Sequence, residues 1–197
     1  MQKRLFSHPS LSSIQMRPSD QRFCSVLHTL QSPQNVGTII RAHVAFGGGP
    51  VVFIGQGRPW DFKKGSQAFS RKLERLCELV FLEHDAAFFD WSLHQGYTPV
   101  AVEIAEHASP LPGFRFPERP AIVVGNERAG LSPAFLTRCE AVVSIPQFGN
   151  VECHNVAVSC ALAMYELNRC RADVLPIAGS KFALNTLKTE GAATTSR

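Results

Sequence analysis

The chain has 197 residues, of which 45% are hydrophobic and 18% are charged, and its formal net charge is +4. That length suits one domain with tails, and the composition is that of an ordinary globular protein. No apolar run approaches the roughly 20 residues that span a bilayer, and the N-terminus lacks the apolar core of a secretory signal. We therefore expect no membrane partner and a cytoplasmic location.

In the first half of the chain, short apolar runs alternate with helical patterns. In chain order we expect an arm over 1–21, a strand over 23–30, a helix over 35–46, a strand over 51–55, a polar loop, a helix over about 66–78, a strand over 80–83 and a helix over 85–95. Asn35 is placed to cap the first of these helices, and Gly96 closes the last one.

The second half continues the alternation. In chain order we expect a strand over 98–104, a Pro-rich loop, a strand over 121–125, a short helix over 133–139, a strand over 141–146, a helix over 154–170 and a tail over 171–197. Since the strands are continuous apolar runs separated by helices, the sequence predicts an α/β domain over 22–170, with a mostly parallel sheet and helices on both faces.

Six cysteines are spread along the chain without a Cys-x-x-Cys pair or a Cys/His spacing typical of zinc. We therefore expect no metal site, and we expect reduced thiols. The cysteines are Cys24, Cys77, Cys139, Cys153, Cys160 and Cys170.

The helix over 35–46 has an apolar side and one isolated arginine. At 100° per residue, Val36, Ile39, His43 and Phe46 share the side that faces the core, so His43 is interpreted as a core histidine. Arg41 lies opposite, among small residues that let another backbone come close to a guanidinium able to bind phosphate or ribose. The alternative is a solvated surface arginine.

Three glycine-bearing loops are candidates for a ligand site. The stretch 47–50 precedes a strand, which is the wrong place for a dinucleotide fingerprint. The loop 125–130 follows a strand but lacks the Gly-x-Gly start, and Glu127 would repel a pyrophosphate. This loop and 145–155 follow strands and are natural pocket walls, and a cationic sulfonium cofactor tolerates Glu127 better than a dinucleotide does.

Three segments, in this order, resemble the three motifs of the SpoU/TrmH family of RNA ribose 2′-O-methyltransferases. They are Asn35-x-Gly37-x-x-x-Arg41, Gly125-x-Glu127-x-x-Gly130, and Ile145-Pro146 followed by Asn155 and a helix that ends in Tyr165-Glu166. Together they bracket residues 23–168, so the domain over 22–170 is expected to be a SpoU-type methyltransferase domain.

The resemblance implies a fold whose C-terminal part is tied in a deep trefoil knot, S-adenosylmethionine as cofactor, transfer or ribosomal RNA as substrate, and a homodimer. It implies that Arg41, near the partner's cofactor, and Asn155 are catalytic residues. It makes Asn35 a substrate-binding residue. The positions that match cofactor contacts are Val102, Gly125, Glu127, Ile145 and Cys153.

Residues 58–75 form a basic run with six basic and two acidic side chains. Lys63 and Lys64 in this run are predicted to bind RNA phosphates, and Trp60 and Phe62 to stack on an unpaired base. A solvated helix face is the alternative interpretation.

The third motif departs from the family pattern, since Cys153-His154 replaces the usual Ser-Leu. A thiol is a weak hydrogen-bond donor, so a role of the serine hydroxyl is in doubt here. This leaves open a catalytically inactive RNA-binding protein of the same fold, and a small-molecule enzyme that binds a dinucleotide is a further alternative. Asn155 is also interpretable as a helix cap, Glu127 as a loop stabiliser and Cys153 as a buried thiol.

Overall fold

The computed structural model describes residues 22–55, 68–151 and 153–171. The predicted arm over 1–21, the basic pair Lys63 and Lys64, the aromatic pair Trp60 and Phe62, and nearly all of the predicted tail lie outside these ranges. Among the described residues, no helix is long and apolar enough to cross a membrane, and no three His, Cys, Asp or Glu side chains come together in a way that could hold a metal ion.

Seven strands form one sheet in the order β3-β2-β1-β6-β4-β7-β5, and every neighbouring pair is parallel. The strands are β1 (Cys24–His28), β2 (Val51–Ile54), β3 (Leu79–Leu82), β4 (Thr98–Val102), β5 (Ser109–Pro110), β6 (Pro120–Val124) and β7 (Ala141–Ser144). All of β2 and β6 and most of β1 are buried, as expected for strands covered on both faces.

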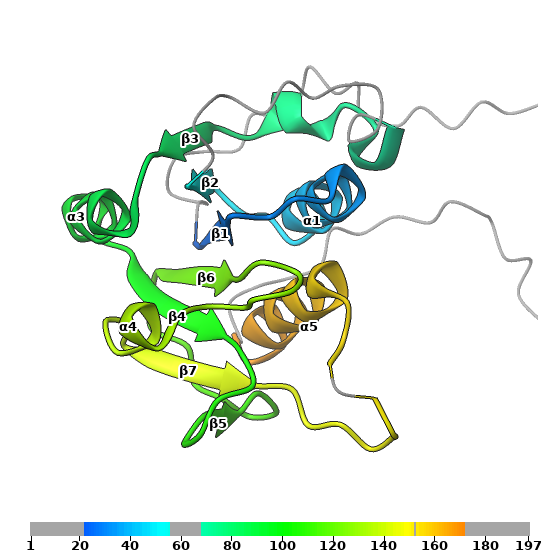
Figure 1. The fold of residues 1–197 in the computed structure, drawn as a ribbon. Helices are drawn as coiled ribbons and strands as arrows, with labels where there is room; N and C mark the ends of the chain where they lie inside the picture. The colour runs from blue at the N-terminus through cyan, green and yellow to red at the C-terminus, as the bar shows by residue number, and fades with distance from the viewer. Residues whose placement is uncertain (1–21, 56–67, 152, 172–197) are drawn as a thin grey trace, which may run out of the picture.

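Helices cover both faces of this sheet (Figure 1). On one face α1 (Pro33–Ala45) packs against α5 (Val156–Arg169), near the short 3-10 helix η3 (Leu73–Leu76). On the other face lie α3 (Asp85–Gln95) and α4 (Pro133–Leu136). The prediction of an α/β domain with a parallel sheet and helices on both faces is confirmed.

The helix faces chosen by periodicity are the ones that pack. In α1, Val36 and Ile39 are fully buried, and in α5 the same holds for Cys160, Met164 and Leu167. These side chains belong to one apolar cluster with the strands beneath them. Burial of each such side chain stabilises the fold by about 1.5–3 kcal/mol relative to exposure, so α5 is a structural part of the core as well as a wall of any site.

His43 is a core histidine, as predicted. Its Nδ1 accepts a hydrogen bond from the Ser25 hydroxyl at 2.8 Å, and its Nε2 donates one to the Gly49 carbonyl at 2.8 Å. Burial lowers the pKa of His43 to about 4, against a weaker opposing effect of the Gly49 carbonyl. A Cβ at Gly48 would overlap the imidazole ring, so the glycine lets the chain close over it.

The first helix starts earlier than expected. The helix α1 begins at Pro33 and is capped by Ser32, whose hydroxyl accepts from the Asn35 amide N–H at 3.4 Å. Proline fits the first turn because no N–H is needed there, which moves the cap upstream of Asn35. The side chain of Asn35 is thereby available for contacts across the sheet edge.

The helix expected over 66–78 is also not continuous. Within its described part, residues 68–70 are helical, but Arg71 and Lys72 adopt positive φ angles of 56° and 63°, and η3 follows. Left-handed backbone ends a right-handed helix at once. The sheet also gains β5, a two-residue strand beside β7 in the segment expected to be a Pro-rich loop.

Candidate functional site

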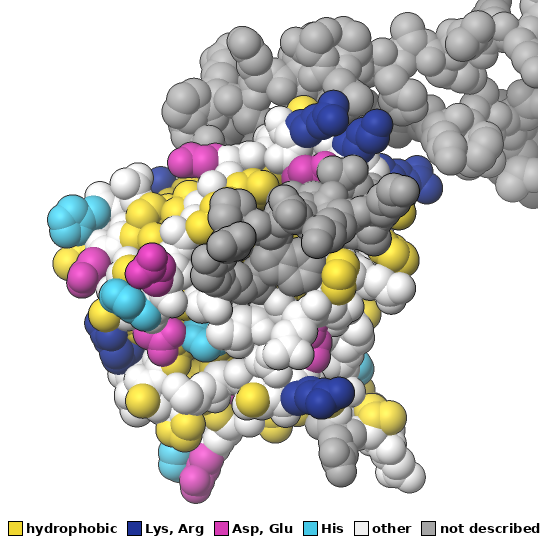
Figure 2. Space-filling model, turned by 45° about the horizontal axis from the view of Figure 1, so that its top comes forward, with side chains coloured by type: hydrophobic (Ala, Val, Ile, Leu, Met, Phe, Trp, Pro, Cys, Tyr) yellow, Lys and Arg dark blue, Asp and Glu magenta, His cyan; other side chains and the backbone are white. Residues whose placement is uncertain are grey.

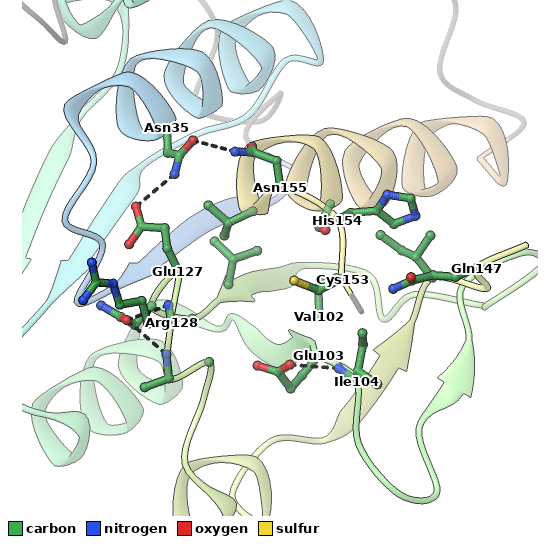
Figure 3. A pocket seen from close by; sticks show the side chains of 18 residues that line it. Asn35, Val102, Glu103, Ile104, Glu127, Arg128, Gln147, Cys153, His154 and Asn155 are labelled. Carbon is green, nitrogen blue, oxygen red and sulfur yellow. Dashed lines mark hydrogen bonds between the residues drawn. The ribbon is translucent and has the colours of Figure 1, made fainter. Parts of the chain in front are cut away.

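A cavity of about 460 Å³ lies at the carboxyl ends of β4, β6 and β7 (Figure 3). Its walls are the residues that follow these three strands, together with the first turns of α1 and α5. Ligands of open parallel sheets bind at this edge, and the volume falls in the range of small-molecule sites, roughly 300–1,000 Å³.

The cavity collects most of the residues singled out in the sequence. All five positions matched to cofactor contacts line it, and so do two of the residues matched to substrate or catalysis. These lining residues are Val102, Gly125, Glu127, Ile145, Cys153, Asn35 and Asn155. Segments more than a hundred residues apart therefore meet in one place.

Glu127 is the most highly connected acid of the cavity. Its Oε1 accepts from the Ser32 amide at 2.9 Å and from the Asn35 side chain at 3.0 Å, and its Oε2 accepts from the Gln31 amide at 3.0 Å. Burial alone would raise the pKa of this carboxyl, but the hydrogen bonds outweigh burial and lower it. The carboxylate thus stays ionised and links the N-terminus of α1 to the loop after β6.

Asn155 extends this network to the third motif. As N-cap of α5, its Oδ1 accepts from the Ala157 amide at 2.9 Å, while its Nδ2 donates to Oδ1 of Asn35 at 3.0 Å. Figure 3 shows the resulting chain of hydrogen bonds from Asn155 through Asn35 to Glu127. The interpretation of Asn155 as a helix cap is confirmed, and the same side chain also joins α5 to α1.

The loop after β6 is tightly folded around its glycines. A Cβ at Gly125 would overlap the backbone of Gly130, and Gly130 itself has a φ of +63°. Asn126 holds the turn, since its Oδ1 accepts from the Arg128 amide at 2.9 Å and its Nδ2 donates to the Thr29 carbonyl at 2.8 Å. Larger residues at either glycine would open the cavity wall.

The opposite wall is more apolar. Val102 is nearly buried and Ile104 is 58% exposed, and both lie under the loop that carries Cys153 and His154. Cys153 and Val102 both line the cavity (Figure 3), and the Cys153 side chain is exposed, so the alternative of a buried thiol is wrong.

Arg41 does not line this cavity. It is exposed on α1, as the helix periodicity predicted, and it makes no hydrogen bond or ion pair with another described residue. The sequence analysis had not singled out Glu103, Asn126 or Gln147, which also line the cavity. Their position just beyond the ends of β4, β6 and β7 is the signal that could have identified them.

Comparison with curated proteins finds relatives that modify RNA. The chain is 29% identical over 153 residues to the mouse tRNA (guanosine(18)-2'-O)-methyltransferase TARBP1, covering 77% of this chain and 10% of that protein. It is 28% identical over 163 residues to the Acinetobacter baylyi 23S rRNA (guanosine-2'-O-)-methyltransferase RlmB, covering 79% of this chain and 63% of that one. The chain thus spans less than two thirds of these relatives.

Two solved structures share the fold. The SpoU methyltransferase AviRb from Streptomyces viridochromogenes, in complex with the cofactor AdoMet, superposes with a TM-score of 0.68 at 26% identity, over 81% of this chain and 63% of that one. An AdoMet-bound rRNA methyltransferase from Sinorhizobium meliloti gives a TM-score of 0.70 at 22% identity, over 78% and 58% of the two chains, and supports the fold alone.

The model of the SpoU rRNA Methylase family matches residues 22–165, a range that contains the whole sheet and the larger part of α5. Apart from Glu166, the three motifs found in the sequence lie within this range, and residues of each motif line the cavity described above. On these grounds the chain belongs to the SpoU rRNA methylase family.

Proposed function

We propose that this chain transfers a methyl group from S-adenosylmethionine to a ribose 2′-hydroxyl of structured RNA, either transfer or ribosomal. The observation that carries the proposal is the cavity, in which residues of all three motifs meet. Family membership supports the reaction class, and relatives named as 2'-O-methyltransferases act on tRNA or on 23S rRNA.

The cavity suits S-adenosylmethionine, which supplies an electrophilic methyl group on a positively charged sulfonium when bound. Val102, Ile104 and Ile145 offer apolar surface for its nucleoside part. Two carboxylates, Glu103 and Glu127, and a single guanidinium, that of Arg128, line the cavity, which gives it a net negative charge. That charge favours a cation and disfavours a pyrophosphate.

Arg41 is proposed as the electrostatic clamp of the reaction. The attacking 2′-hydroxyl must lose a proton, but an arginine does not deprotonate in proteins and cannot serve as the base. A guanidinium beside the developing alkoxide, or beside the adjacent phosphate, stabilises the transition state, and the proton passes to phosphate or water. Asn155 and Asn35 would hold the loop and substrate in position, consistent with their mutual hydrogen bond.

A homodimer would bring Arg41 to a cavity that it does not line in its own chain. The outer side of α5 carries Val158, Leu162 and Tyr165, which are 48%, 39% and 56% exposed and recur at helical spacing. We infer that this stripe packs against the same stripe of a second copy. Such an isologous contact removes the exposed apolar side chains of both copies from water. Each cavity would then receive the arginine of the partner.

The C-terminal segment is proposed to form the deep trefoil knot that the family resemblance implies. After β7, near one edge of the sheet, the chain returns so that α5 packs on α1 and β6. Ile145, Gln147 and residues 153–155 line the cavity at the ends of β4 and β6. Threading of this connection under another loop would enclose the cofactor.

RNA is expected to reach the cavity along basic surface. Arg71, Lys72 and Arg75 are exposed around η3, and Figure 2 shows Lys and Arg side chains gathered near the upper edge of that view. These residues continue the basic run that includes Lys63 and Lys64, which we propose to contact phosphates. Such contacts raise affinity for any RNA and make it salt-dependent.

Methyl transfer from labelled S-adenosylmethionine into transfer and ribosomal RNA tests the proposal, with the product digested to locate 2′-O-methyl nucleotides. Arg41→Ala should lower the single-turnover rate by about 100-fold or more and leave cofactor affinity unchanged. Heterodimers of Arg41→Ala with Gly125→Val chains should recover activity, because one of the two composite sites is intact. An active Arg41→Ala enzyme, or inactive verified heterodimers, would contradict the assigned role.

A second candidate, RNA binding without catalysis, is supported by one observation. The side chain that lines the cavity where the family carries serine is the thiol of Cys153. Calorimetric titration with S-adenosylmethionine separates the two functions. Binding by the wild-type chain supports catalysis, whereas binding that appears only in Cys153→Ser would identify a protein whose cofactor site has decayed.

A further inference from the structure

One aromatic side chain stands fully in solvent beside the cavity. Phe148 is 99% exposed, more than any other large hydrophobic residue that the structure describes. Burying a phenylalanine is worth about 1.5–3 kcal/mol, so a ring left this exposed in the folded chain is available to a partner.

Phe148 lies on the loop after β7, directly after a residue of the cavity wall. The preceding residue, Gln147, lines the cavity, and Figure 3 places it at the same end as Ile104 and His154. Two further exposed apolar side chains, Ile104 at 58% and Val151 at 61%, lie on the two segments that flank this end. The segments that flank this end of the cavity therefore carry exposed apolar side chains.

The loop has the chemistry of base recognition rather than of phosphate binding. Residues 145–151 contain no charged side chain, and along the sequence Phe148 lies between two residues with amide side chains, Gln147 and Asn150. Aromatic rings stack on unpaired bases regardless of their identity, and amide side chains read base edges by hydrogen bonding.

We propose that Phe148 is a stacking platform for an unpaired nucleobase of the RNA substrate, at the rim of the cofactor cavity. The proposal rests on the proposed function, because it names the form of RNA that enters the site. Ribose chemistry inside a cavity requires a nucleotide that is not held in a regular duplex. An aromatic platform at the rim selects such nucleotides and orients the adjoining ribose.

Fluorescence of Phe148→Trp tests stacking directly, with a ten-nucleotide oligoadenylate as the single-stranded probe and the same strand paired with oligouridylate as the duplex. Stacking quenches the new indole with the single strand and much less with the duplex. The matched control is Leu93→Trp, an indole at a 77% exposed position on α3, on the other face of the sheet. Wild-type titrations supply the background of Trp60 and Trp91.

Affinity for oligoadenylate provides the second measurement. Phe148→Ala should bind roughly five- to a hundredfold more weakly, Phe148→Leu should bind nearly as weakly, and Phe148→Tyr should match the wild type. Gly149→Ala is the neighbouring control, because its Cβ would meet no atom within 4 Å, and it should bind normally.

The outcomes separate this proposal from the proposed function. Both RNA measurements are made without cofactor, so a chain that fails to bind S-adenosylmethionine can still show stacking. Equal quenching at positions 148 and 93, or unchanged affinity in Phe148→Ala, overturns the platform. A shift of Phe148→Ala from dimer to monomer in sedimentation would assign the ring to a second copy of the chain and would likewise overturn it.

Discussion

Replacing Glu127 is the sharpest test of the network that joins the three motifs. Its two oxygens accept three hydrogen bonds, two of them on Oε1. In Glu127→Gln the amide oxygen can keep the pair on Oε1, but the new NH₂ group faces the Gln31 amide, which is also a donor. Glu127→Ala removes all three contacts.

The expected magnitudes follow from that count. A hydrogen bond to a charged group contributes about 1.5–3 kcal/mol, and partial exposure of this carboxylate reduces each to roughly 1 kcal/mol. Glu127→Ala should therefore lower the free energy of unfolding by about 3 kcal/mol, and Glu127→Gln by about 1–2 kcal/mol. Urea unfolding followed by circular dichroism measures both, and calorimetry should show weaker cofactor binding in each variant.

The pH dependence of stability tests the negative charge of Glu127 separately from its hydrogen bonds. Because the folded-state pKa of Glu127 is lowered, its contribution is present above the unfolded pKa, about 4.5, and is lost as pH falls through the folded value. The difference between wild type and Glu127→Gln should be constant from pH 6 to 8 and shrink below about pH 4.5. A difference that persists unchanged at pH 3, or its absence at pH 7, would refute the role of the ionised carboxylate.

Three further predictions concern other parts of the fold. The pKa of His43 is lowered to about 4, whereas an unfolded histidine titrates near 6.5. The free energy of unfolding should therefore fall by about 3 kcal/mol as the pH drops from 6.5 to 4. The NMR titration midpoint of the ring should lie well below 6.5. Asn155→Ala should lower the free energy of unfolding by about 1 kcal/mol in urea melts, because the helix cap is lost. Asn155→Asp keeps the cap but loses the hydrogen bond to Asn35. Equal stability of the wild type and both variants would contradict the capping role. Lys72→Ala with Arg75→Ala should flatten the log–log salt dependence of RNA affinity by about 0.7–0.9 per lost phosphate contact, and an unchanged slope in filter binding would exclude these side chains from the RNA surface.

The parts of the fold that the sequence predicted correctly depend on local periodicity. The stripes of α1 and α5, the closing glycine of α3 at Gly96 and the proline in the first turn of α4 follow from spacing and from fixed backbone preferences, and all are observed. The interrupted segment around Arg71 and Lys72 was missed, because nothing in two basic side chains signals left-handed backbone. The strand β5 was missed since it exists only through its pairing with β7.

For the site, family motifs located the lining residues but not their connections. Glu127 was expected at a cofactor contact, with a loop stabiliser as the alternative. It does fix a loop, yet its partners Gln31 and Ser32 lie more than ninety residues earlier and were not predicted. Asn155 was expected as a catalytic residue, with a helix cap as the alternative, and its bond to Asn35 depends on how α5 packs on α1. Such contacts depend on tertiary packing, which no single segment encodes.

The hydrogen bond between Asn35 and Asn155 also has a consequence for biosynthesis. Its two partners are separated by 120 residues, so on a translating ribosome the first motif emerges well before the third. At about 5–20 residues per second, roughly 6–24 s separate the two events. During this interval α1 lacks the helix that covers it, so its apolar stripe stays exposed on the nascent chain, and the cavity can form only after the third motif has emerged.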